Sequence, residues 1–316
     1  MIETMMIWRN VLLLIPFLAL ISCGSSQKEE TAKSEEARKF FAYDTSLYEP
    51  VQIDYHIYGE NDTTLLFIHG WNLNQTYWAN QVTSLSKRFT VVTLDLAGHG
   101  NSGRDRKNWT VEAFAKDILS IIEKESLNQI ILVGHSIGGE IALDVCRRAP
   151  EKIVGFIGID NFKDIDFDIT PEFKKGFERY LGEFEVDYNG KVEELAARNC
   201  KVEDAEIVTR IEEDYKSADP NIAVQILKNM VPYYDTERKR LRKIKVPLHI
   251  IASDLSPYNL VALDRYAKAG YSIEWIRGSG HFPMIEKPKP FQRAFEKTLT
   301  KILLKSDSLP KAKHLH

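Results

Sequence analysis

Short runs of branched apolar residues alternate along the chain with segments of helical periodicity, and this alternation restricts the fold more than any other feature. Runs that are apolar at nearly every position suit strands that are covered on both faces, as in a mostly parallel sheet with helices on either side. The runs are VQIDYHIYG, TTLLFIHG, FTVVTLDL, QIILVG, KIVGFIGID, VPLHIIASD and YSIEWIRG. The sequence therefore predicts an α/β fold with a mostly parallel central sheet.

The first two runs, residues 51–59 and 63–70, leave too little chain between them for a helix. Parallel neighbours need a longer crossover, so we expect these two runs to form an antiparallel edge. Helical spacing appears in WANQVTSLSKRF, TVEAFAKDILSIIEKESL, SIGGEIALDVCRRAP and EKPKPFQRAFEKTLTKILL. In the second of these segments the apolar residues Val111, Phe114, Ile118 and Ile121 recur every three or four positions, which predicts one buried stripe.

The stretch 161–240 interrupts the alternation with long, charged, helical segments. It predicts a helical cap inserted into a core formed by residues 41–160 and 241–305, followed by a tail at 306–316. Aromatic side chains of the cap either line a substrate pocket or pack its helices, and packing is favoured for any one of them. They are Phe173, Phe177, Tyr180, Phe184, Tyr233 and Tyr234.

Composition places the chain among globular proteins, since 44% of its 316 residues are apolar and 28% are charged. One large domain, or one domain with an insertion, is expected. The net charge of -3 and the pI near 6.3 show no excess of basic residues, which binding to nucleic acid requires. A nucleic-acid partner is therefore not expected.

The first 22 residues have the pattern of a signal peptide, with Arg9 before an apolar run that is too short to span a bilayer. Leu20-Ile21-Ser22-Cys23 resembles a bacterial lipobox, which implies cleavage before Cys23 and lipidation of that cysteine. An ordinary signal peptide is the alternative. Residues 23–40 are small, polar and charged, so they predict a flexible tether. The resemblance implies an exported protein anchored in the bacterial cell envelope, with the outer membrane favoured by Gly24.

Cysteines and histidines give no sign of a metal site, because no pair of them has the spacing of zinc ligands. Cys146 and Cys200 are predicted to be unpaired and inert. We therefore expect neither a cofactor nor a metal.

The stretch ILVGHSIGGE at 131–140 places Ser136 between glycines, after an apolar run and before a helical segment. Gly134-His135-Ser136-Ile137-Gly138 fits G-x-S-x-G, in which a sharp strand-to-helix turn strains the serine backbone and exposes its hydroxyl. The helix that follows directs its positive end toward the same point. Ser136 is the predicted nucleophile, although a glycine-rich turn without chemistry would also fit the pentapeptide.

A serine nucleophile needs a base and a carboxylate that orients the base. Among the histidines, His281 lies between the last strand-like run and the last helix, so its side chain can return to the strand ends. Asp254 and Asp160 both follow strand-like runs. Asp254 is the predicted acid, because the chain order serine, aspartate, histidine is typical of this motif, and Asp160 is the alternative. A buried salt bridge or a helix cap would account for either aspartate without catalysis.

Attack on a carbonyl also needs hydrogen-bond donors for the oxyanion that forms. One donor is expected from the backbone amide of Ile137, directly after the nucleophile. The other is expected from the amide of Trp71, because Gly70 lets the loop after TTLLFI turn toward the pocket. His69 is interpreted as a residue that fixes this loop.

Together these residues resemble the α/β-hydrolase superfamily, in its cap-bearing lipase and esterase-like branch. The resemblance extends from about Tyr48 to Leu304 and follows the family's order of motifs. The motifs are FIHGW, DLAGHGNSG, VGHSIGG, IIASD and GHFPMIEKP. By position it implies Ser136 as nucleophile, His281 as base, Asp254 as acid, and Trp71 with Ile137 as oxyanion donors. It also implies a mainly structural loop that contains Asp95, His99 and Ser102.

The resemblance implies a serine hydrolase that cleaves a small carboxylic ester or thioester through an acyl-enzyme. Dehalogenase and epoxide hydrolase relatives carry aspartate at the elbow, so Ser136 argues against those activities. The same residues would serve cleavage of a carbon–carbon bond, an amide or a lactone. A ligand-binding or signalling protein with low turnover is a further alternative, and a scaffold is disfavoured because it would leave the triad unexplained.

Overall fold

A computed structural model of the chain describes residues 49–201 and 204–306. The predicted signal peptide, Cys23, the tether and the tail beyond Ser306 lie outside the described residues. Within the described part, no helix is both long and apolar enough to cross a membrane.

The centre of the molecule is a seven-stranded sheet in the order β1-β3-β2-β4-β5-β6-β7. Its strands are β1 (Tyr55–Tyr58), β2 (Thr64–Ile68), β3 (Thr90–Leu94), β4 (Ile130–His135), β5 (Ile153–Ile159), β6 (Leu248–Ser253) and β7 (Tyr271–Ile276). All pairings are parallel except that of β1 with β3. The mostly parallel sheet is therefore confirmed.

The pairing at the first edge differs from the prediction. β1 is antiparallel, but it pairs with β3 and not with β2. Every residue of β2 is buried, and β3 and β4 occupy its two edges. A strand with neighbours on both sides has no free hydrogen-bonding edge left, so β1 adds to the outer edge of β3.

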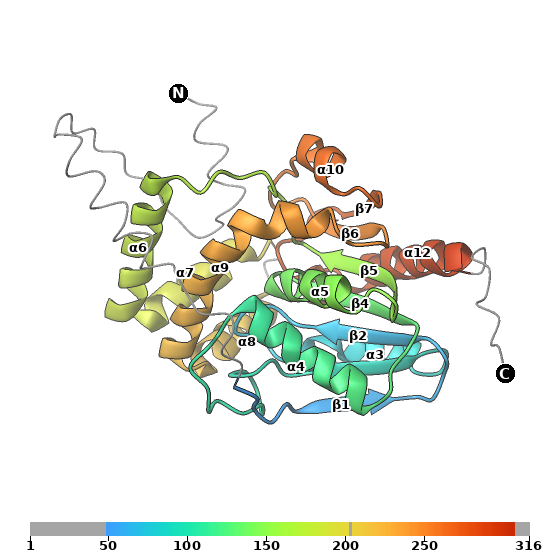
Figure 1. The fold of residues 1–316 in the computed structure, drawn as a ribbon. Coiled ribbons are helices and arrows are strands. Elements are labelled where there is room, and N and C mark those ends of the chain that lie inside the picture. The colour runs from blue at the N-terminus through green and yellow to red at the C-terminus, as the bar shows by residue number, and fades with distance from the viewer. Residues whose placement is uncertain (1–48, 202–203, 307–316) are drawn as a thin grey trace.

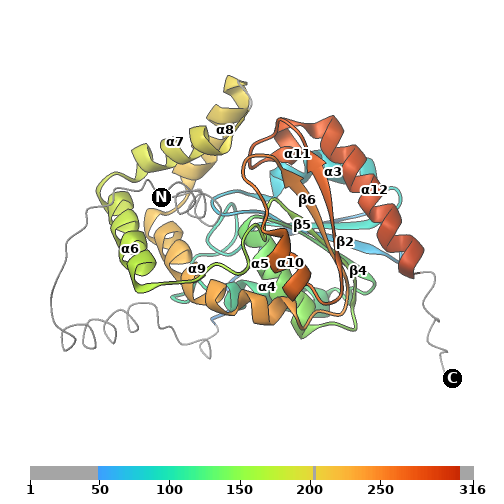
Figure 2. The same cartoon turned by 90° about the horizontal axis from the view of Figure 1, so that it is seen from above.

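Helices cover both faces of the sheet (Figure 2). On one face lie α4 (Val111–Lys124) and α5 (Ile137–Arg148), and on the other lie α3 (Ala79–Leu85) and α12 (Pro288–Ser306). Shorter elements are η1 (Gln75–Trp78), α10 (Leu260–Tyr266) and α11 (Pro283–Glu286). The predicted stripe of α4 is buried throughout. The Thr110 side chain accepts a hydrogen bond from the Ala113 amide and caps this helix.

Between β5 and β6 the chain forms four helices, which are called the inserted helices below. They are α6 (Pro171–Val186), α7 (Tyr188–Asn199), α8 (Ala205–Ser217) and α9 (Pro220–Leu241). Thr170 caps α6 and Asp219 caps α9 through side-chain oxygens, and each is followed by a proline at the first helical position. The six parallel strands, β2 to β7, point their carboxyl ends toward the inserted helices (Figure 1). The inserted helices thus cover the edge of the sheet that carries the predicted site residues.

Candidate active site

Ser136 occupies the turn between β4 and α5, with φ of 51° and ψ of -129°. A positive φ is costly for a residue with a side chain, so the surrounding packing must hold it. The packing is close: a Cβ atom on Gly138 would lie 2.5 Å from the Ile68 carbonyl oxygen, and one on Gly134 would lie 2.2 Å from the Gly138 carbonyl oxygen. The glycines of the pentapeptide are therefore required by the approach of backbone to backbone.

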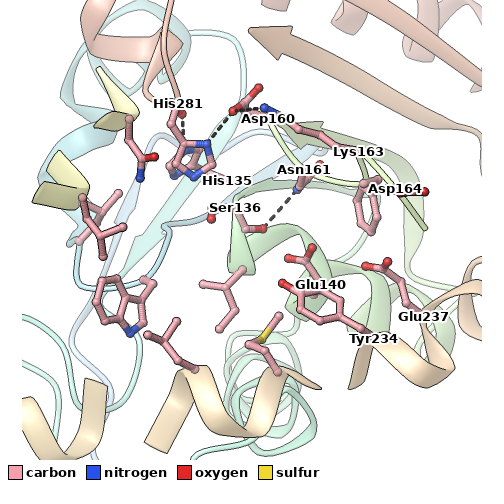
Figure 3. Close-up of a pocket in the computed structure, with 18 of the residues that line it drawn as sticks. His135, Ser136, Glu140, Asp160, Asn161, Lys163, Asp164, Tyr234, Glu237 and His281 are labelled. Carbon is pink, nitrogen blue, oxygen red and sulfur yellow. Dashed lines mark hydrogen bonds and ion pairs between the residues drawn. The ribbon is translucent and has the colours of Figure 1, made fainter. Parts of the chain in front are cut away.

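His281 lies between β7 and α11, and its ring is hydrogen-bonded to a carboxylate. Its Nδ1 lies 2.6 Å from Asp160 Oδ2, and Asp160 follows β5 directly. Because a carboxylate only accepts, Nδ1 carries a proton, and in the neutral imidazole Nε2 is then the acceptor. Ser136 and His281 line the same cavity (Figure 3).

The structure corrects the prediction for the acid. Asp254 does not contact His281; its Oδ1 lies 3.0 Å from Lys201 Nζ, and it accepts hydrogen bonds from the Gly278 amide. Its side chain is 27% exposed, whereas that of Asp160 is fully buried. The alternative, Asp160, is the aspartate that the fold brings to His281. Chain order could not separate the two, since both lie between Ser136 and His281.

Asp160 is held by polar groups from three segments. Its Oδ1 accepts from the Ser253 amide at 2.9 Å and from the Ser253 hydroxyl at 2.6 Å, while Oδ2 lies 3.0 Å from Lys163 Nζ. Burial alone would raise the pKa of Asp160, but the Lys163 ammonium and the hydrogen bonds from His281 and Ser253 hold that pKa well below its usual range. The carboxyl group is thus ionised at neutral pH. Sequence reasoning missed Lys163, whose only signal is its position three residues after Asp160.

The loop after β2 lies against the serine. A Cβ atom on Gly70 would be 3.2 Å from Ser136 Cβ. His69 Nδ1 donates to the Gly70 carbonyl at 2.8 Å, and His69 Nε2 accepts from the Leu96 amide at 2.9 Å. Because the peptide between Gly70 and Trp71 is trans, fixing this carbonyl turns the Trp71 N–H the opposite way. These contacts fit the interpretation of His69 as a loop-fixing residue, and the roles of Trp71 and Ile137 as oxyanion donors stay predictions.

Burial keeps His69 and His135 neutral at pH 7. It lowers the pKa of His69 to about 4 and that of His135 to about 3. His135 Nε2 donates to the His281 carbonyl at 2.7 Å, and the two rings are 4.7 Å apart between centroids. His135 therefore fixes the segment that carries His281.

The loop with Asp95, His99 and Ser102 makes contacts within the core. Asp95 accepts from the amides of Gln75 and Asn101, and Ser102 Oγ donates to the Asp95 carbonyl at 2.6 Å. None of the three predicted loop residues lines the cavity. This agrees with the structural role that the family resemblance implies.

The cavity encloses about 160 Å³ between the sheet edge and the inserted helices. Its walls include Ser136, His281, Trp71 and Ile137 from the core, together with Tyr234 of α9. The other aromatic residues considered for the pocket do not line it and are buried in the core: Phe173, Phe177, Tyr180, Phe184 and Tyr233. Trp71 also links the core to α9 of the inserted helices, since its indole N–H donates to the Ala223 carbonyl at 2.9 Å.

Cysteine placement agrees with the prediction that Cys146 and Cys200 are unpaired; both are free thiols, and burial raises the pKa of each to about 12. Within residues 49–201 and 204–306, no group of three or more His, Cys, Asp or Glu side chains is arranged to hold a metal ion.

Comparison with known proteins identifies relatives over most of the chain. A pimeloyl-[acyl-carrier protein] methyl ester esterase from Sodalis glossinidius (strain morsitans) is 29% identical over 248 residues, which cover 75% of this chain and 93% of that protein. A putative esterase/lipase from Haemophilus influenzae is 27% identical over 264 residues, covering 76% and 84%. The solved structure of a thermophilic esterase from Thermogutta terrifontis matches with a TM-score of 0.69 at 25% identity, covering 80% of this chain and 94% of that one.

The family model described as the alpha/beta hydrolase fold matches residues 63–288, which include β2, the elbow, the inserted helices and the His281 loop. The match covers more than half of the chain and agrees with the sheet order and the elbow described above. The protein therefore belongs to the α/β-hydrolase fold family.

Proposed function

We propose that this protein is a serine hydrolase that cleaves a small carboxylic ester through an acyl-enzyme, with Ser136 as nucleophile, His281 as base and Asp160 as acid. The observation that carries the proposal is the 2.6 Å hydrogen bond between His281 Nδ1 and Asp160, beside a strained serine in the same cavity. An arrangement of this kind activates a hydroxyl that is otherwise a weak nucleophile.

In the first half of the reaction, Ser136 Oγ attacks the ester carbonyl carbon and its proton passes to His281 Nε2. The oxyanion would be stabilised by the amides of Trp71 and Ile137. His281 then gives the proton to the alcohol oxygen as the carbon–oxygen bond breaks. In the second half, water attacks the acyl carbon, its proton passes through His281 to Ser136 Oγ, and the carboxylic acid leaves.

We propose an ester as substrate, and not an amide, a thioester or a carbon–carbon bond, because the similar proteins named above are described as esterases. The test is turnover of p-nitrophenyl butyrate beside the p-nitroanilide of the same acid. We expect the ester to be hydrolysed with a kcat/KM at least a hundredfold above that of the anilide. A folded protein that cleaves neither compound would contradict the proposed function, and preference for the anilide would contradict the ester class.

We further propose that the enzyme is anchored in the bacterial cell envelope through a lipid on Cys23, which rests on the lipobox-like Leu20-Ile21-Ser22-Cys23. A protein held only by attached acyl chains should leave the membrane fraction when they are missing. Cys23→Ser should therefore shift the protein from the detergent phase to the aqueous phase in detergent partition. A Cys200→Ser variant is the control. Continued partition of Cys23→Ser into detergent would place the anchor elsewhere.

A further inference from the structure

The cavity has a second polar end that the proposed chemistry does not use. Glu140 of α5, Asp164 of the loop after β5, and Tyr234 with Glu237 of α9 line it, and these residues are called the acidic end below. Figure 3 shows them on the opposite side of Ser136 from His281. The acidic end and the proposed catalytic residues therefore belong to one cavity that a single substrate can fill.

Two carboxyl oxygens at the acidic end are buried without a partner. Glu140 and Glu237 are 5% and 4% exposed, and neither Glu140 Oε2 nor Glu237 Oε1 has a hydrogen-bond partner. A buried polar atom without a partner destabilises the folded state, and more so when it is charged. Such atoms in a cavity wall point to a ligand that donates hydrogen bonds to them.

Two cations beside the acidic end, Lys163 in the cavity wall and Arg240 on α9, already have partners. Lys163 Nζ lies 3.0 Å from both Asp160 Oδ2 and Ser256 Oγ. Arg240, one turn beyond Glu237 on α9, pairs with Glu112 and with Asp144. Neither side chain forms an ion pair with Glu140 or Glu237 in the described part of the chain. The two glutamates therefore line the cavity without an ion-pair partner among the described residues.

The carboxyl groups of the acidic end have raised pKa values. Burial, and then the neighbouring Glu237, raise the pKa of Glu140; burial, and then Asp164, raise the pKa of Glu237 against the opposing effect of Arg240. Burial also raises the pKa of Asp164, which accepts a hydrogen bond from Asn259 Nδ2 at 2.9 Å. Repulsion between the carboxyl groups adds to the effect of burial on these pKa values. An incoming cation would offset that repulsion, whereas an anionic ligand would add to it.

We propose that the substrate of this esterase carries a protonated amine, which donates hydrogen bonds to Glu140 and Glu237 while its ester group lies at Ser136. The inference rests on the proposed function. An alkylammonium group has up to three N–H donors, which suits the two unpartnered oxygens and the hydroxyl of Tyr234. Glu140 lies one helical turn after Ser136, about 6 Å along the axis of α5, so the amine is separated from the scissile carbonyl by a short chain.

The test uses pairs of esters that match in shape and differ in charge. Methyl 6-aminohexanoate with methyl heptanoate places a primary ammonium group on the acyl side, and 4-aminobutyl butyrate with pentyl butyrate places it on the alcohol side. We expect the cationic member of at least one pair to have a kcat/KM at least tenfold higher than its neutral partner. The pair that shows the preference identifies the side of the ester that carries the amine.

Two variants on α9 locate the preference. Glu237→Gln should reduce the ratio of cationic to neutral kcat/KM to within about twofold of unity, because an amide lacks the negative charge. Asp235→Asn is the matched control, since Asp235 is exposed on the same helix and does not line the cavity; it should keep the ratio of the unmodified protein. Equal turnover or a preference for the neutral ester in both pairs would overturn the inference, as would a preference that survives Glu237→Gln.

A binding measurement separates failure of this inference from failure of the proposed function. Hexylammonium should raise the midpoint of thermal unfolding more than 1-hexanol does at the same concentration, and Glu237→Gln should remove the difference. If this difference is seen but no ester is cleaved, the amine site stands and the hydrolase proposal fails. If esters are cleaved without cation preference and hexylammonium has no greater effect than hexanol, the amine site fails and the hydrolase proposal stands.

Discussion

Replacing Asp160 by asparagine should lower kcat for ester hydrolysis by about four orders of magnitude and leave the fold intact. The asparagine amide can present its NH₂ group to His281 Nδ1, which favours the tautomer that carries the proton on Nε2. That tautomer cannot accept the proton of Ser136. The measurement is the steady-state rate with p-nitrophenyl butyrate, with circular dichroism to verify folding.

Asp254→Asn is the control for this prediction, because Asp254 contacts Lys201 and the Gly278 amide and lies away from His281. We expect its kcat to stay within about fivefold of the unmodified protein, as for a partly exposed ion pair. A collapse of kcat in Asp254→Asn together with near-normal turnover in Asp160→Asn would restore Asp254 as the acid.

Replacing Ser136 by alanine should reduce kcat by about six orders of magnitude, to the level of hydrolysis without a nucleophile. Alanine keeps the Cβ that the elbow already accommodates, so the loss would be chemical and not structural. The measurement is hydrolysis of p-nitrophenyl butyrate at high enzyme concentration. Ser120→Ala, at an exposed position of α4, is the matched control and should be fully active. Substantial turnover by Ser136→Ala would mean that another group attacks the ester.

The fold could be predicted to a large extent because its signals are local. Each buried strand is a short apolar run, and α4 shows its buried stripe in four residues. The partner of β1 could not be predicted in the same way. The choice between β2 and β3 depends on which strand keeps a free edge after β4 has paired with β2, and this is a property of the assembled sheet.

The candidate site also contains residues that local sequence signals identify and residues that they do not. Ser136 lies in a motif whose turn geometry follows from its own glycines, and His281 follows the last strand, so both were accessible from the sequence. The aspartate that contacts His281 was not, because Asp160 and Asp254 each follow a strand of the sheet. What distinguishes them is that Ser253 and Lys163 contact Asp160, whereas Asp254 forms an ion pair with Lys201 of the segment after α7.

The acidic end had no sequence signal at all. Glu140 and Glu237 belong to helices rich in charged residues, where a glutamate ordinarily faces solvent. Their burial follows from the packing of α5 against α9, which brings together residues nearly a hundred positions apart. Only the three-dimensional arrangement reveals two carboxyl groups that share a cavity.

The proposed hydrolysis requires above all that Ser136 is a reactive nucleophile. Incubation of the folded protein with a fluorophosphonate probe, followed by intact-mass measurement and peptide mapping, tests this independently of the natural substrate. We expect one adduct per chain, located at Ser136, and much slower labelling of Asp160→Asn. No adduct on the folded protein, or an adduct on a different residue in place of Ser136, would contradict the proposed hydrolysis.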